Sequence, residues 1–471
     1  MIKFGTGGWQ AVIADEFTKR NIRLLACALA RKLKDDDKAE NGIVIGYDRR
    51  FLSCEAAKWA AEVMAGEGIY TRIIDRESPT PLVMFAVKKD KLPAGLAVTA
   101  SHNPAVYNGI KVFMEGGRDA DEEYTGEIEQ YISGLEDSDV KSIPYEEGIQ
   151  KGMIVLTDPM NDYIDSIISA IDLDVIRESN LHIVLDPMYG VSKTALQTIL
   201  LTARCKLDVI HERRDALFGG RLPAPNHKTL AGLMNYVEEN GCDIGIATDG
   251  DADRLGVIDD KAQFLHPNKI LVLLYYYLLK YKGWKGAVVR NLATTHLVDR
   301  IAESFGETFY EVPVGFKHIS SGMVKTGAII GGESSGGLTV RGHIQGKDGI
   351  YAAALLIEMI AATKMKLSEL YSRIEREYGV YEMEERDYRF SQEKKEEIKK
   401  ILFHDKLLPV FPYAVKKVSY LDGCKVYFEN NGWIIARFSG TEPLIRIFCE
   451  IGSAAEANAA IDIFEKFLKL G

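Results

Sequence analysis

Apolar and polar positions along the chain follow two recurring patterns, which together predict a repeated α/β architecture. Short apolar runs of strand length, such as 42–48 and 70–75, alternate with longer segments in which apolar residues recur at helical spacing, as in 21–34. Strands that alternate with helices are typical of a sheet with parallel strands and crossover helices. The pattern therefore predicts a strand–helix–strand–helix–strand unit that ends with the apolar run before residue 99.

The same order of strands and helices recurs twice more along the chain. The apolar runs of the second and third units are 181–186, 206–210, 242–247, 286–289, 307–312 and 327–331. Each unit is longer than the repeat of a solenoid protein, so we expect three similar α/β domains. In every unit the third strand runs directly into a polar loop that contains glycine or serine.

The chain changes character at 382–386, a charged segment that we interpret as a connector. A helix over 391–403 and strands over 423–428 and 433–438 follow, which predicts a smaller C-terminal α+β domain. We therefore expect three similar α/β domains with mixed sheets flanked by helices, and a smaller fourth domain, around a central cleft. The predicted domains are 1–148, 149–258, 259–370 and 371–471.

Length, composition and charge narrow the class of protein. With 471 residues the chain is too long for one hydrophobic core, and 46% hydrophobic with 27% charged residues is typical of a globular protein. A net charge of −10 argues against nucleic acid or an anionic membrane as partner. No signal-peptide pattern or membrane-length apolar run is present, and the six cysteines lack metal-site spacing. These features predict a cytoplasmic protein without a zinc site or disulfide framework.

The first candidate for chemistry is the loop Thr99-Ala100-Ser101-His102-Asn103-Pro104. A serine at the carboxyl end of a strand lies where open α/β sheets bind ligands, and Pro104 stiffens the loop. An ordinary turn would use the same residue types. A Ser–His–Asp hydrolase is disfavoured, because adjacent Ser101 and His102 do not form such a triad and no G-x-S-x-G motif is present.

The second candidate loop contains three aspartates, Asp249, Asp251 and Asp253, directly after a predicted strand. Alternating carboxylates in a tight turn suit a hard divalent cation with oxygen ligands. An EF-hand is excluded, because that loop requires glycine where Arg254 stands and glutamate where Asp260 stands. A solvated acidic turn is the alternative. The guanidinium of Arg254 suggests an anionic partner such as a phosphate.

Two further loops complete the set. Glu333 and Ser335, within the glycine-rich stretch 331–337, could bind the hydroxyls of a polyol, although a plain turn would look the same. The stretch 437–446 supplies arginines, hydroxyls and a glycine-bearing turn, which could hold a phosphate, with surface ion pairs as the alternative. A serine, a metal loop, a polyol loop and a remote phosphate loop together indicate phosphoryl transfer on a phosphorylated sugar.

In this order the four loops resemble the motifs of the α-D-phosphohexomutase family, the phosphoglucomutases and phosphomannomutases, over essentially the whole chain. The resemblance implies that Ser101 carries a phosphoryl group and that Mg²⁺ is bound by Ser101, Asp249, Asp251 and Asp253. The implied catalytic residues are Ser101, His102, Lys111 and Arg254. The implied substrate-binding residues are Lys317, Glu333, Ser335, Arg437, Ser439, Gly440, Thr441 and Arg446.

The resemblance further implies interconversion of hexose 1-phosphate and hexose 6-phosphate through a sugar 1,6-bisphosphate, with glucose 1,6-bisphosphate as activator, a mobile fourth domain, and a monomer or homodimer. Two departures from the family pattern stand out. Gln10 lies where an arginine is usual near the serine, and Gly337 lies where some mannose-tolerant members have histidine, which favours glucose over mannose. The alternatives are a phosphoglucosamine mutase, a phosphopentomutase, or a catalytically weak sugar-phosphate-binding protein.

Overall fold

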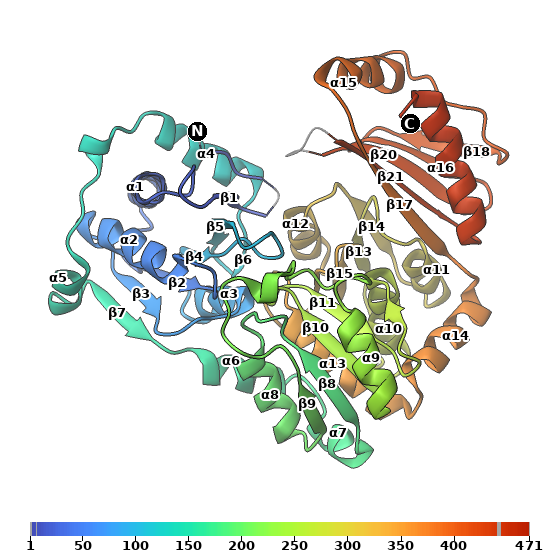
Figure 1. The fold of residues 1–471 in the computed structure, drawn as a ribbon, viewed down its shortest axis with the longest axis horizontal. Coiled ribbons are helices and arrows are strands. Elements are labelled where there is room, and N and C mark those ends of the chain that lie inside the picture. Colours follow the sequence, from blue (N-terminus) through green and yellow to red (C-terminus); the bar gives the residue numbers. More distant parts are fainter. Residues whose placement is uncertain (1, 6, 440–443, 471) are drawn as a thin grey trace.

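Four successive units, each built on its own β-sheet, form the protein (Figure 1). The structure is a computed structural model, and it describes residues 2–5, 7–439 and 444–470. The first unit lies to the left in Figure 1, the second and third lie side by side below and to its right, and the fourth lies above the third.

The first sheet has the strand order β1-β5-β4-β2-β3-β7, with β6 paired to β5. Its strands are β1 Trp9–Val12, β2 Ile43–Tyr47, β3 Thr71–Ile74, β4 Ala94–Val98, β5 Tyr107–Met114, β6 Arg118–Asp119 and β7 Ile154–Thr157. Its helices are α1 Lys19–Asp35, α2 Ser53–Gly66, α3 Thr80–Lys89, α4 Glu122–Ser133 and α5 Tyr145–Gln150. Helix α1 begins at Lys19 because the Thr18 side chain accepts a hydrogen bond from the backbone N–H of Asn21.

The second and third sheets are smaller. The second has the order β12-β11-β10-β8-β9 and the third the order β14-β13-β15-β16. The second unit comprises α6 Met160–Ile168, α7 Leu173–Ser179, β8 His182–Asp186, α8 Lys193–Thr202, β9 Lys206–Val209, α9 Ala231–Asn240, β10 Ile244–Thr248, β11 Leu255–Ile258 and β12 Phe264–Leu265. The third comprises α10 Pro267–Lys280, β13 Val288–Asn291, α11 Leu297–Ser304, β14 Phe309–Val312, α12 Phe316–Thr326, β15 Ile330–Gly332, β16 Leu338–Val340, α13 Gly349–Thr363 and α14 Leu367–Tyr378.

The three α/β units share one topology, as the repeated pattern predicts. In each, the first strand pairs in parallel with the second and the third, and the third pairs with an antiparallel strand that follows it. The loops that contain Ser101, the three aspartates and Glu333 therefore occupy equivalent places, between the third strand and its antiparallel partner. Three loops with different functional side chains therefore lie at the same edge of three similar sheets.

The fourth unit is an antiparallel sheet with the order β17-β21-β20-β19-β18. It comprises β17 Glu382–Arg389, α15 Gln392–Lys399, β18 Val415–Ser419, β19 Cys424–Phe428, β20 Trp433–Phe438, β21 Leu444–Ile451 and α16 Ala454–Leu468. The interpretation of 382–386 as a connector is wrong, because this segment is the start of the edge strand β17. An edge strand is half exposed, so it tolerates the charged residues that suggested a linker.

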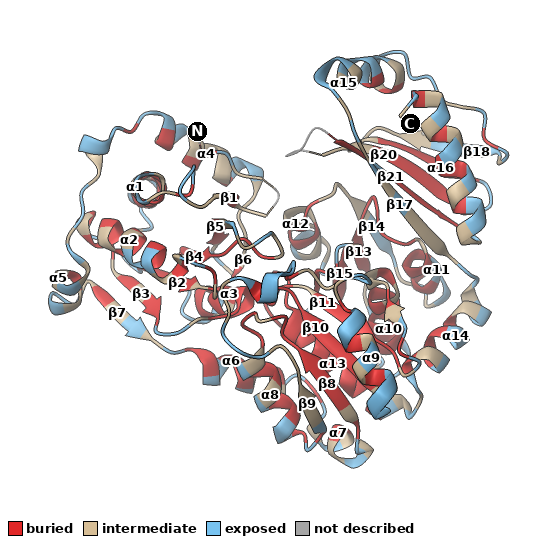
Figure 2. Ribbon diagram, in the orientation of Figure 1, coloured by how far each residue is buried: buried red, intermediate tan, exposed pale blue. Residues whose placement is uncertain are grey.

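One continuous hydrophobic core joins the first three units and fixes the relative positions of their loops. It runs from α3 through α6 and α8 to α10 and α13, where residues such as Leu82, Ile164, Leu196 and Leu355 are buried. Helix α13 is almost entirely buried (Figure 2).

The first two sheets extend beyond the predicted ends of their domains. The first sheet extends to Thr157 and the second to Leu265. The domain boundaries at 148 and 258 remain predictions. Within the described ranges, no helix combines the length and apolarity that crossing a membrane requires.

Candidate active site

The serine loop of the first unit and the aspartate loop of the second meet directly. The Ser101 hydroxyl donates a hydrogen bond to Asp249 Oδ2 at 2.6 Å, and the Thr80 backbone N–H at the start of α3 donates to the Asp251 carbonyl at 2.9 Å. The Thr80 hydroxyl also donates to Asp251 Oδ2. The two loops lie together because each follows the carboxyl end of a parallel strand and the units share a core.

Ser101 is held in an unusual backbone conformation. Its φ is 51°, in the left-handed region that a residue with a Cβ rarely adopts, and its side chain is buried. Its backbone N–H donates to the Thr99 hydroxyl at 2.8 Å. Strain of this kind persists only where the surroundings impose it, and it is frequent at functional sites.

Arg50 imposes much of this loop conformation, although the sequence analysis did not single it out. Its guanidinium donates hydrogen bonds to the carbonyl oxygens of Ser101 and Asn103, both at 2.7 Å, and to those of Pro104 at 2.9 Å and Tyr107 at 3.0 Å. The side chain is completely buried. The sequence pattern could have indicated Arg50, because it comes shortly after the predicted strand 42–48, just as the other candidate residues come shortly after a predicted strand.

The aspartate cluster, which we define as Asp249, Asp251 and Asp253, is buried and surrounded by cations. Ligand atoms of the three carboxylates lie within 4.8 Å of one another. Lys111 of β5 donates to Asp251 Oδ2 and to Asp253 Oδ2, both at 2.6 Å. Lys347, which precedes α13, lies with its Nζ 3.1 Å from Asp253 Oδ2. No spacing or motif in the sequence distinguishes Lys347 from an ordinary surface lysine.

The environment shifts the pKa values of the cluster in opposite directions. Burial raises the pKa of Asp249 well above its usual range, and the neighbouring carboxylates raise it further. Burial alone would also raise the pKa of Asp253, but the charges of Lys111, Lys347 and Arg254 outweigh it and the pKa is lowered. The lysines and the arginine thus keep part of the cluster ionised inside the protein.

The donor set of the aspartate cluster fits a hard divalent cation. Asp251 Oδ1 and Asp253 Oδ1 are buried and have no hydrogen-bond partner among the described residues. Leaving such oxygens unsatisfied is costly, and a cation with oxygen ligands would satisfy them. Ser101 Oγ, which contacts Asp249, lies beside this all-oxygen group.

His102 lies next to Ser101 but is a weak base. Its Nδ1 is 3.4 Å from the Ser101 hydroxyl oxygen. The positive charge of Arg254, together with burial, lowers the pKa of His102 to about 2. The imidazole is therefore neutral near pH 7 and has little tendency to take a proton from Ser101.

The glycine-rich loop of the third unit adjoins the aspartate loop. The Leu255 backbone N–H donates to the Gly336 carbonyl at 3.2 Å. The Ser335 hydroxyl donates to Glu333 Oε1 at 2.6 Å, and the Asn291 amide donates to Glu333 Oε2 at 3.3 Å. Glu333 and Ser335 are thus brought together beside the aspartate cluster.

Lys317 lies where the third unit contacts the first unit. It is near the start of α12, and its Nζ is 2.7 Å from Glu122 Oε1 at the start of α4. His318 Nε2 is 3.9 Å from the same oxygen.

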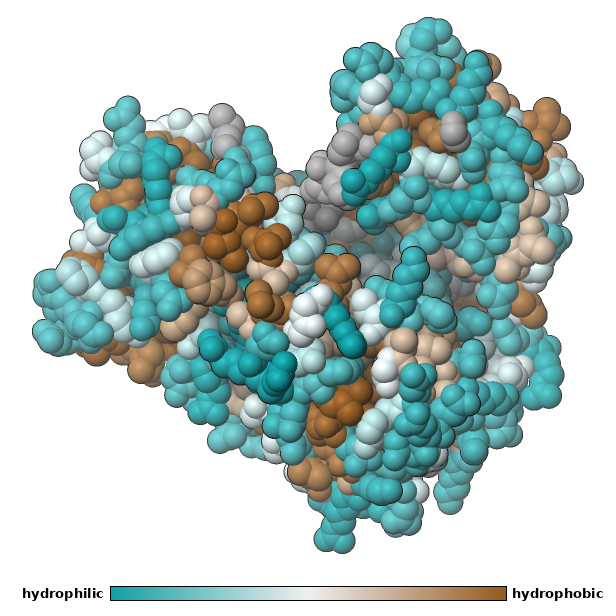
Figure 3. Space-filling view, in the orientation of Figure 1, coloured by the Kyte–Doolittle hydropathy of each residue, from teal (hydrophilic) through white to brown (hydrophobic). Residues whose placement is uncertain are grey.

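The fourth unit holds the remaining candidate residues. Arg437 Nε donates to both carboxylate oxygens of Asp422 at 2.9 Å, and Arg446 Nε lies 3.4 Å from Asp387 Oδ1. Arg437 and Arg446 are directly opposite each other on β20 and β21, an arrangement that an anion would stabilise. Ser439 follows β20, its backbone N–H bonded to the Leu444 carbonyl at 2.9 Å, whereas Gly440 and Thr441 lie outside the described residues. Figure 3 shows the surface hollowed between the first and fourth units.

Comparison with known protein families assigns all four units. Four family models match in succession, described as Phosphoglucomutase/phosphomannomutase, alpha/beta/alpha domain I at residues 1–139, domain II at 161–262, domain III at 266–378, and C-terminal domain at 395–466. The chain belongs to the phosphoglucomutase/phosphomannomutase family. It is a phosphohexomutase, an isomerase of sugar phosphates.

Individual relatives span nearly the whole phosphohexomutase chain. A Thermococcus kodakarensis protein named phosphoglucomutase/phosphomannomutase is 29% identical over 467 residues, covering 99% of this chain and 98% of its own. A Pyrococcus furiosus protein named "Probable phosphoglucosamine mutase" is 31% identical, with coverages of 97% and 95%. A Thermus thermophilus crystal structure, provisionally assigned as a phosphomannomutase, is 30% identical with a TM-score of 0.86, covering 99% of each chain. The relatives therefore differ in the sugar that their names specify.

Both departures from the phosphohexomutase pattern have a structural counterpart. Gln10 is neutral, but its Oε1 accepts a hydrogen bond from the Asn103 amide at 2.6 Å and so contacts the serine loop. A Cβ added at Gly337 would lie 2.3 Å from Cδ of Lys347. The space of a side chain at position 337 is therefore filled by the lysine that reaches Asp253.

Proposed function

We propose that this phosphohexomutase interconverts hexose 1-phosphate and hexose 6-phosphate, with glucose as the preferred sugar and Ser101 as the phosphoryl carrier. The observation that carries the proposal is the 2.6 Å hydrogen bond from Ser101 to Asp249, which joins the serine loop to a buried cluster of three carboxylates. Phosphoryl transfer depends mainly on alignment and on charge neutralisation, and this arrangement supplies both.

Asp249, Asp251 and Asp253, together with an oxygen on Ser101, would hold Mg²⁺. The bound ion would neutralise negative charge on the phosphoryl group. Lys111 and Arg254, which lie next to different oxygens of Asp253, would stabilise the equatorial oxygens as charge develops. The buried Arg50 would keep Ser101 in its left-handed conformation while this occurs.

The substrate would be held at two places far apart. Glu333 and Ser335 would bind sugar hydroxyls, and Lys317 would contact the substrate from the boundary between the first and third units. Arg437, Ser439 and Arg446, with Gly440 and Thr441, would grip the phosphate that does not react. The sugar would gain a second phosphate from Ser101, turn round as a 1,6-bisphosphate and return the other one. Glucose 1,6-bisphosphate would therefore act as an activator by phosphorylating Ser101.

The position of the Lys347 side chain favours glucose over glucosamine as the sugar of the substrate. Its side chain packs across Gly337 of the sugar loop, where a Cβ would also lie 3.5 Å from Glu333 Oε1. A lysine ammonium at this loop would repel the protonated amine of glucosamine 6-phosphate and would tolerate a hydroxyl. Phosphoglucosamine mutase is the second candidate, since several relatives carry that name.

A substrate panel tests the choice of sugar. Glucose, mannose and glucosamine 1-phosphates and ribose 1-phosphate are compared by kcat/KM, with Mg²⁺ and with or without glucose 1,6-bisphosphate. We expect glucose to be the best substrate and the bisphosphate to shorten the lag before steady turnover. A higher kcat/KM for glucosamine would overturn the glucose assignment while leaving the mutase chemistry intact.

The variant Ser101→Ala tests the carrier role. We expect loss of turnover with every sugar, together with loss of the phosphate that mass spectrometry detects on the Ser101 peptide of the unmodified enzyme. Near-normal turnover of Ser101→Ala in the presence of glucose 1,6-bisphosphate would contradict the mechanism. Tight bisphosphate binding by the unmodified enzyme without any turnover would favour a binding protein instead.

A further inference from the structure

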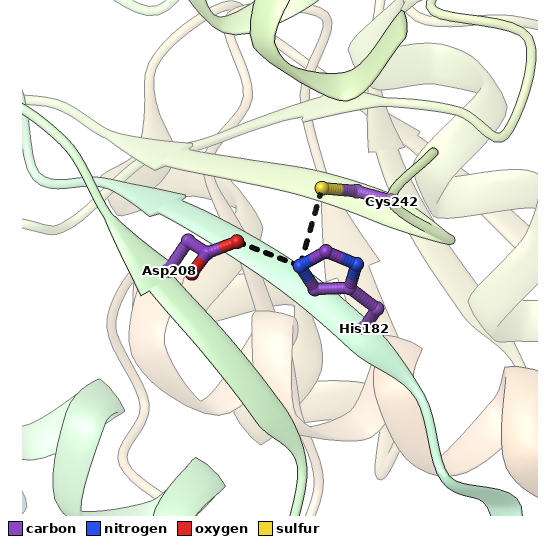
Figure 4. Close-up of side chains that lie close together, drawn as sticks. All are labelled: His182, Asp208 and Cys242. Atoms are coloured by element: carbon purple, nitrogen blue, oxygen red, sulfur yellow. Dashed lines mark hydrogen bonds and ion pairs between the residues drawn. The ribbon is translucent and has the colours of Figure 1, made fainter. Parts of the chain in front are cut away.

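A second cluster of ligand-type side chains lies in the second unit, at the opposite end of the sheet from the aspartate cluster. His182 is the first residue of β8, Asp208 belongs to the neighbouring strand β9, and Cys242 lies two residues before the amino end of β10 (Figure 4). Their ligand atoms lie within 4.8 Å of one another. We name these three residues the thiol cluster.

Asp208 and Cys242 both contact the same ring nitrogen of His182. His182 Nε2 is 2.6 Å from Asp208 Oδ2 and 3.7 Å from Cys242 Sγ. In a Cys–His–Asp proton relay, the thiol and the carboxylate bind opposite nitrogens of the imidazole. Here the oxygen and the sulfur both lie against Nε2, so the three ligand atoms are grouped closely enough to share one ion.

The distances suit a tetrahedral zinc-type ion. Bonds of about 2.0 Å to nitrogen and about 2.3 Å to sulfur place these two ligands about 3.5 Å apart at a tetrahedral angle. The observed separation of 3.7 Å between Nε2 and Sγ needs almost no change. The carboxylate would have to move away from Nε2 by less than about 1 Å, which a side-chain rotation of the partly exposed Asp208 allows.

We propose that His182, Asp208 and Cys242 bind one zinc-type divalent ion, with solvent in the fourth position. The donor set of thiolate, imidazole and carboxylate favours Zn²⁺ over Mg²⁺, which prefers oxygen ligands alone. The sequence predicted no zinc site, because the ligands are separated by 26 and 34 positions rather than by a compact motif. Adjacent strands bring them together.

Protons and nearby charges change in a defined way on binding. The Cys242 thiol releases its proton to solvent as the sulfur–metal bond forms, and the imidazole proton moves to Nδ1 so that Nε2 can bind the ion. Lys206 Nζ, 3.4 Å from Nδ1, must then turn away, which its exposed side chain permits. Asp243 Oδ2 accepts the His182 backbone N–H at 2.8 Å and keeps the strand end in place.

The ion would join three neighbouring parallel strands, β8, β9 and β10, without touching the aspartate cluster. From Cys242 to Asp249 the chain runs along β10, a distance of about 20 Å at the rise of a strand. The ion would therefore stabilise the second unit, and the phosphoryl-transfer chemistry would not depend on it.

Cobalt titration of the metal-free protein tests the site. Excess Mg²⁺ is present to occupy the aspartate cluster, and a phosphine reductant keeps the thiols reduced. We expect one equivalent of Co²⁺ to produce the visible bands of a tetrahedral ion and the near-ultraviolet charge-transfer band of a Co–thiolate bond. One equivalent of Zn²⁺ should abolish both. We also expect Zn²⁺ to raise the Tm of the unmodified protein.

Cys242→Ala should lose the thiolate band and the Tm shift, whereas the control Cys205→Ala, at another buried cysteine of the same unit, should keep both. Asp208→Asn retains the thiol and should weaken Co²⁺ binding at least tenfold, which tests the site even if Cys242→Ala folds poorly. The absence of a thiolate band in the unmodified protein, or an unchanged band in Cys242→Ala, would overturn the proposal.

Discussion

The two ends of strand β10 carry clusters of opposite character. At the carboxyl end, the aspartate cluster has only oxygen donors, is fully buried, and is approached by Lys111, Lys347 and Arg254. At the amino end, the thiol cluster has one oxygen, one nitrogen and one sulfur donor, and Asp208 is partly exposed. One strand of five residues thus separates two clusters with different sets of donor atoms.

The different surroundings of the aspartate cluster and the thiol cluster give two ends of the same sheet different chemical properties. The aspartate cluster lies where loops of the first and third units converge, and under the proposed function it would act on a substrate held between units. In the part of the chain that the structure describes, the hydrogen-bond partners of His182 belong to the second unit, so the proposed ion would act on the stability of that unit. Substitutions at one end of the strand, each with a matched control elsewhere, measure how far the two clusters differ.

The largest effect is expected for Lys111→Met. This change removes the ammonium that bridges Asp251 and Asp253, and it leaves the buried Asp251 without that ion pair, whereas Asp253 keeps Lys347. We expect kcat to fall by about 10²- to 10³-fold and the metal-free protein to lose about 3–5 kcal/mol of unfolding free energy. Lys206→Met, beside the thiol cluster, is the control and should leave kcat within about twofold. Equal losses of kcat in both variants would show that the two ends of β10 do not differ in their importance for activity.

A smaller effect is expected for Arg50→Lys, which keeps the charge but loses the fork that binds four carbonyl oxygens of the serine loop. Displacing Ser101 by about 1 Å should lower kcat by about 10²-fold with little change in KM. Steady-state kinetics and the phosphorylated fraction of Ser101 measure this.

Arg49→Lys is the matched control for this positioning role. Arg49 donates to the carbonyl oxygens of Tyr189, Glu212 and Arg213, not to those of the serine loop. The kcat of the Arg49→Lys variant should therefore change less than that of the Arg50→Lys variant. If both variants lose the same activity, Arg50 acts on general stability and not on the position of Ser101.

The smallest effect is expected for Gly337→Ala. The new methyl group would meet the Lys347 side chain, which must leave Asp253 to make room. We expect kcat/KM for glucose 1-phosphate to fall by about 10- to 30-fold, the equivalent of one charged hydrogen bond, and discrimination against glucosamine to decrease. In a double-mutant cycle with Lys347→Ala, the two losses should not add. Full additivity would show that position 337 and Lys347 act independently.

The repeated units and the kinds of loop chemistry could be predicted from the sequence. Strand and helix patterns are local, and so is the position of Ser101, the three aspartates or Glu333 immediately after a strand. The segment 382–386 was misread because an edge strand lacks the apolar alternation of a half-buried one. The assigned roles of the individual site residues remain predictions.

What the sequence by itself determined is which donors each loop carries, because residue type and neighbouring positions suffice for that. Only the tertiary structure decided which groups meet. Ser101 and Asp249 are 148 positions apart, Lys111 and Asp251 are 140 apart, and Lys347 reaches Asp253 across the empty side of Gly337. Arg50 beneath the serine loop and His182 between Asp208 and Cys242 follow the same rule. Such contacts depend on the packing of whole units around a shared core, which no local pattern specifies.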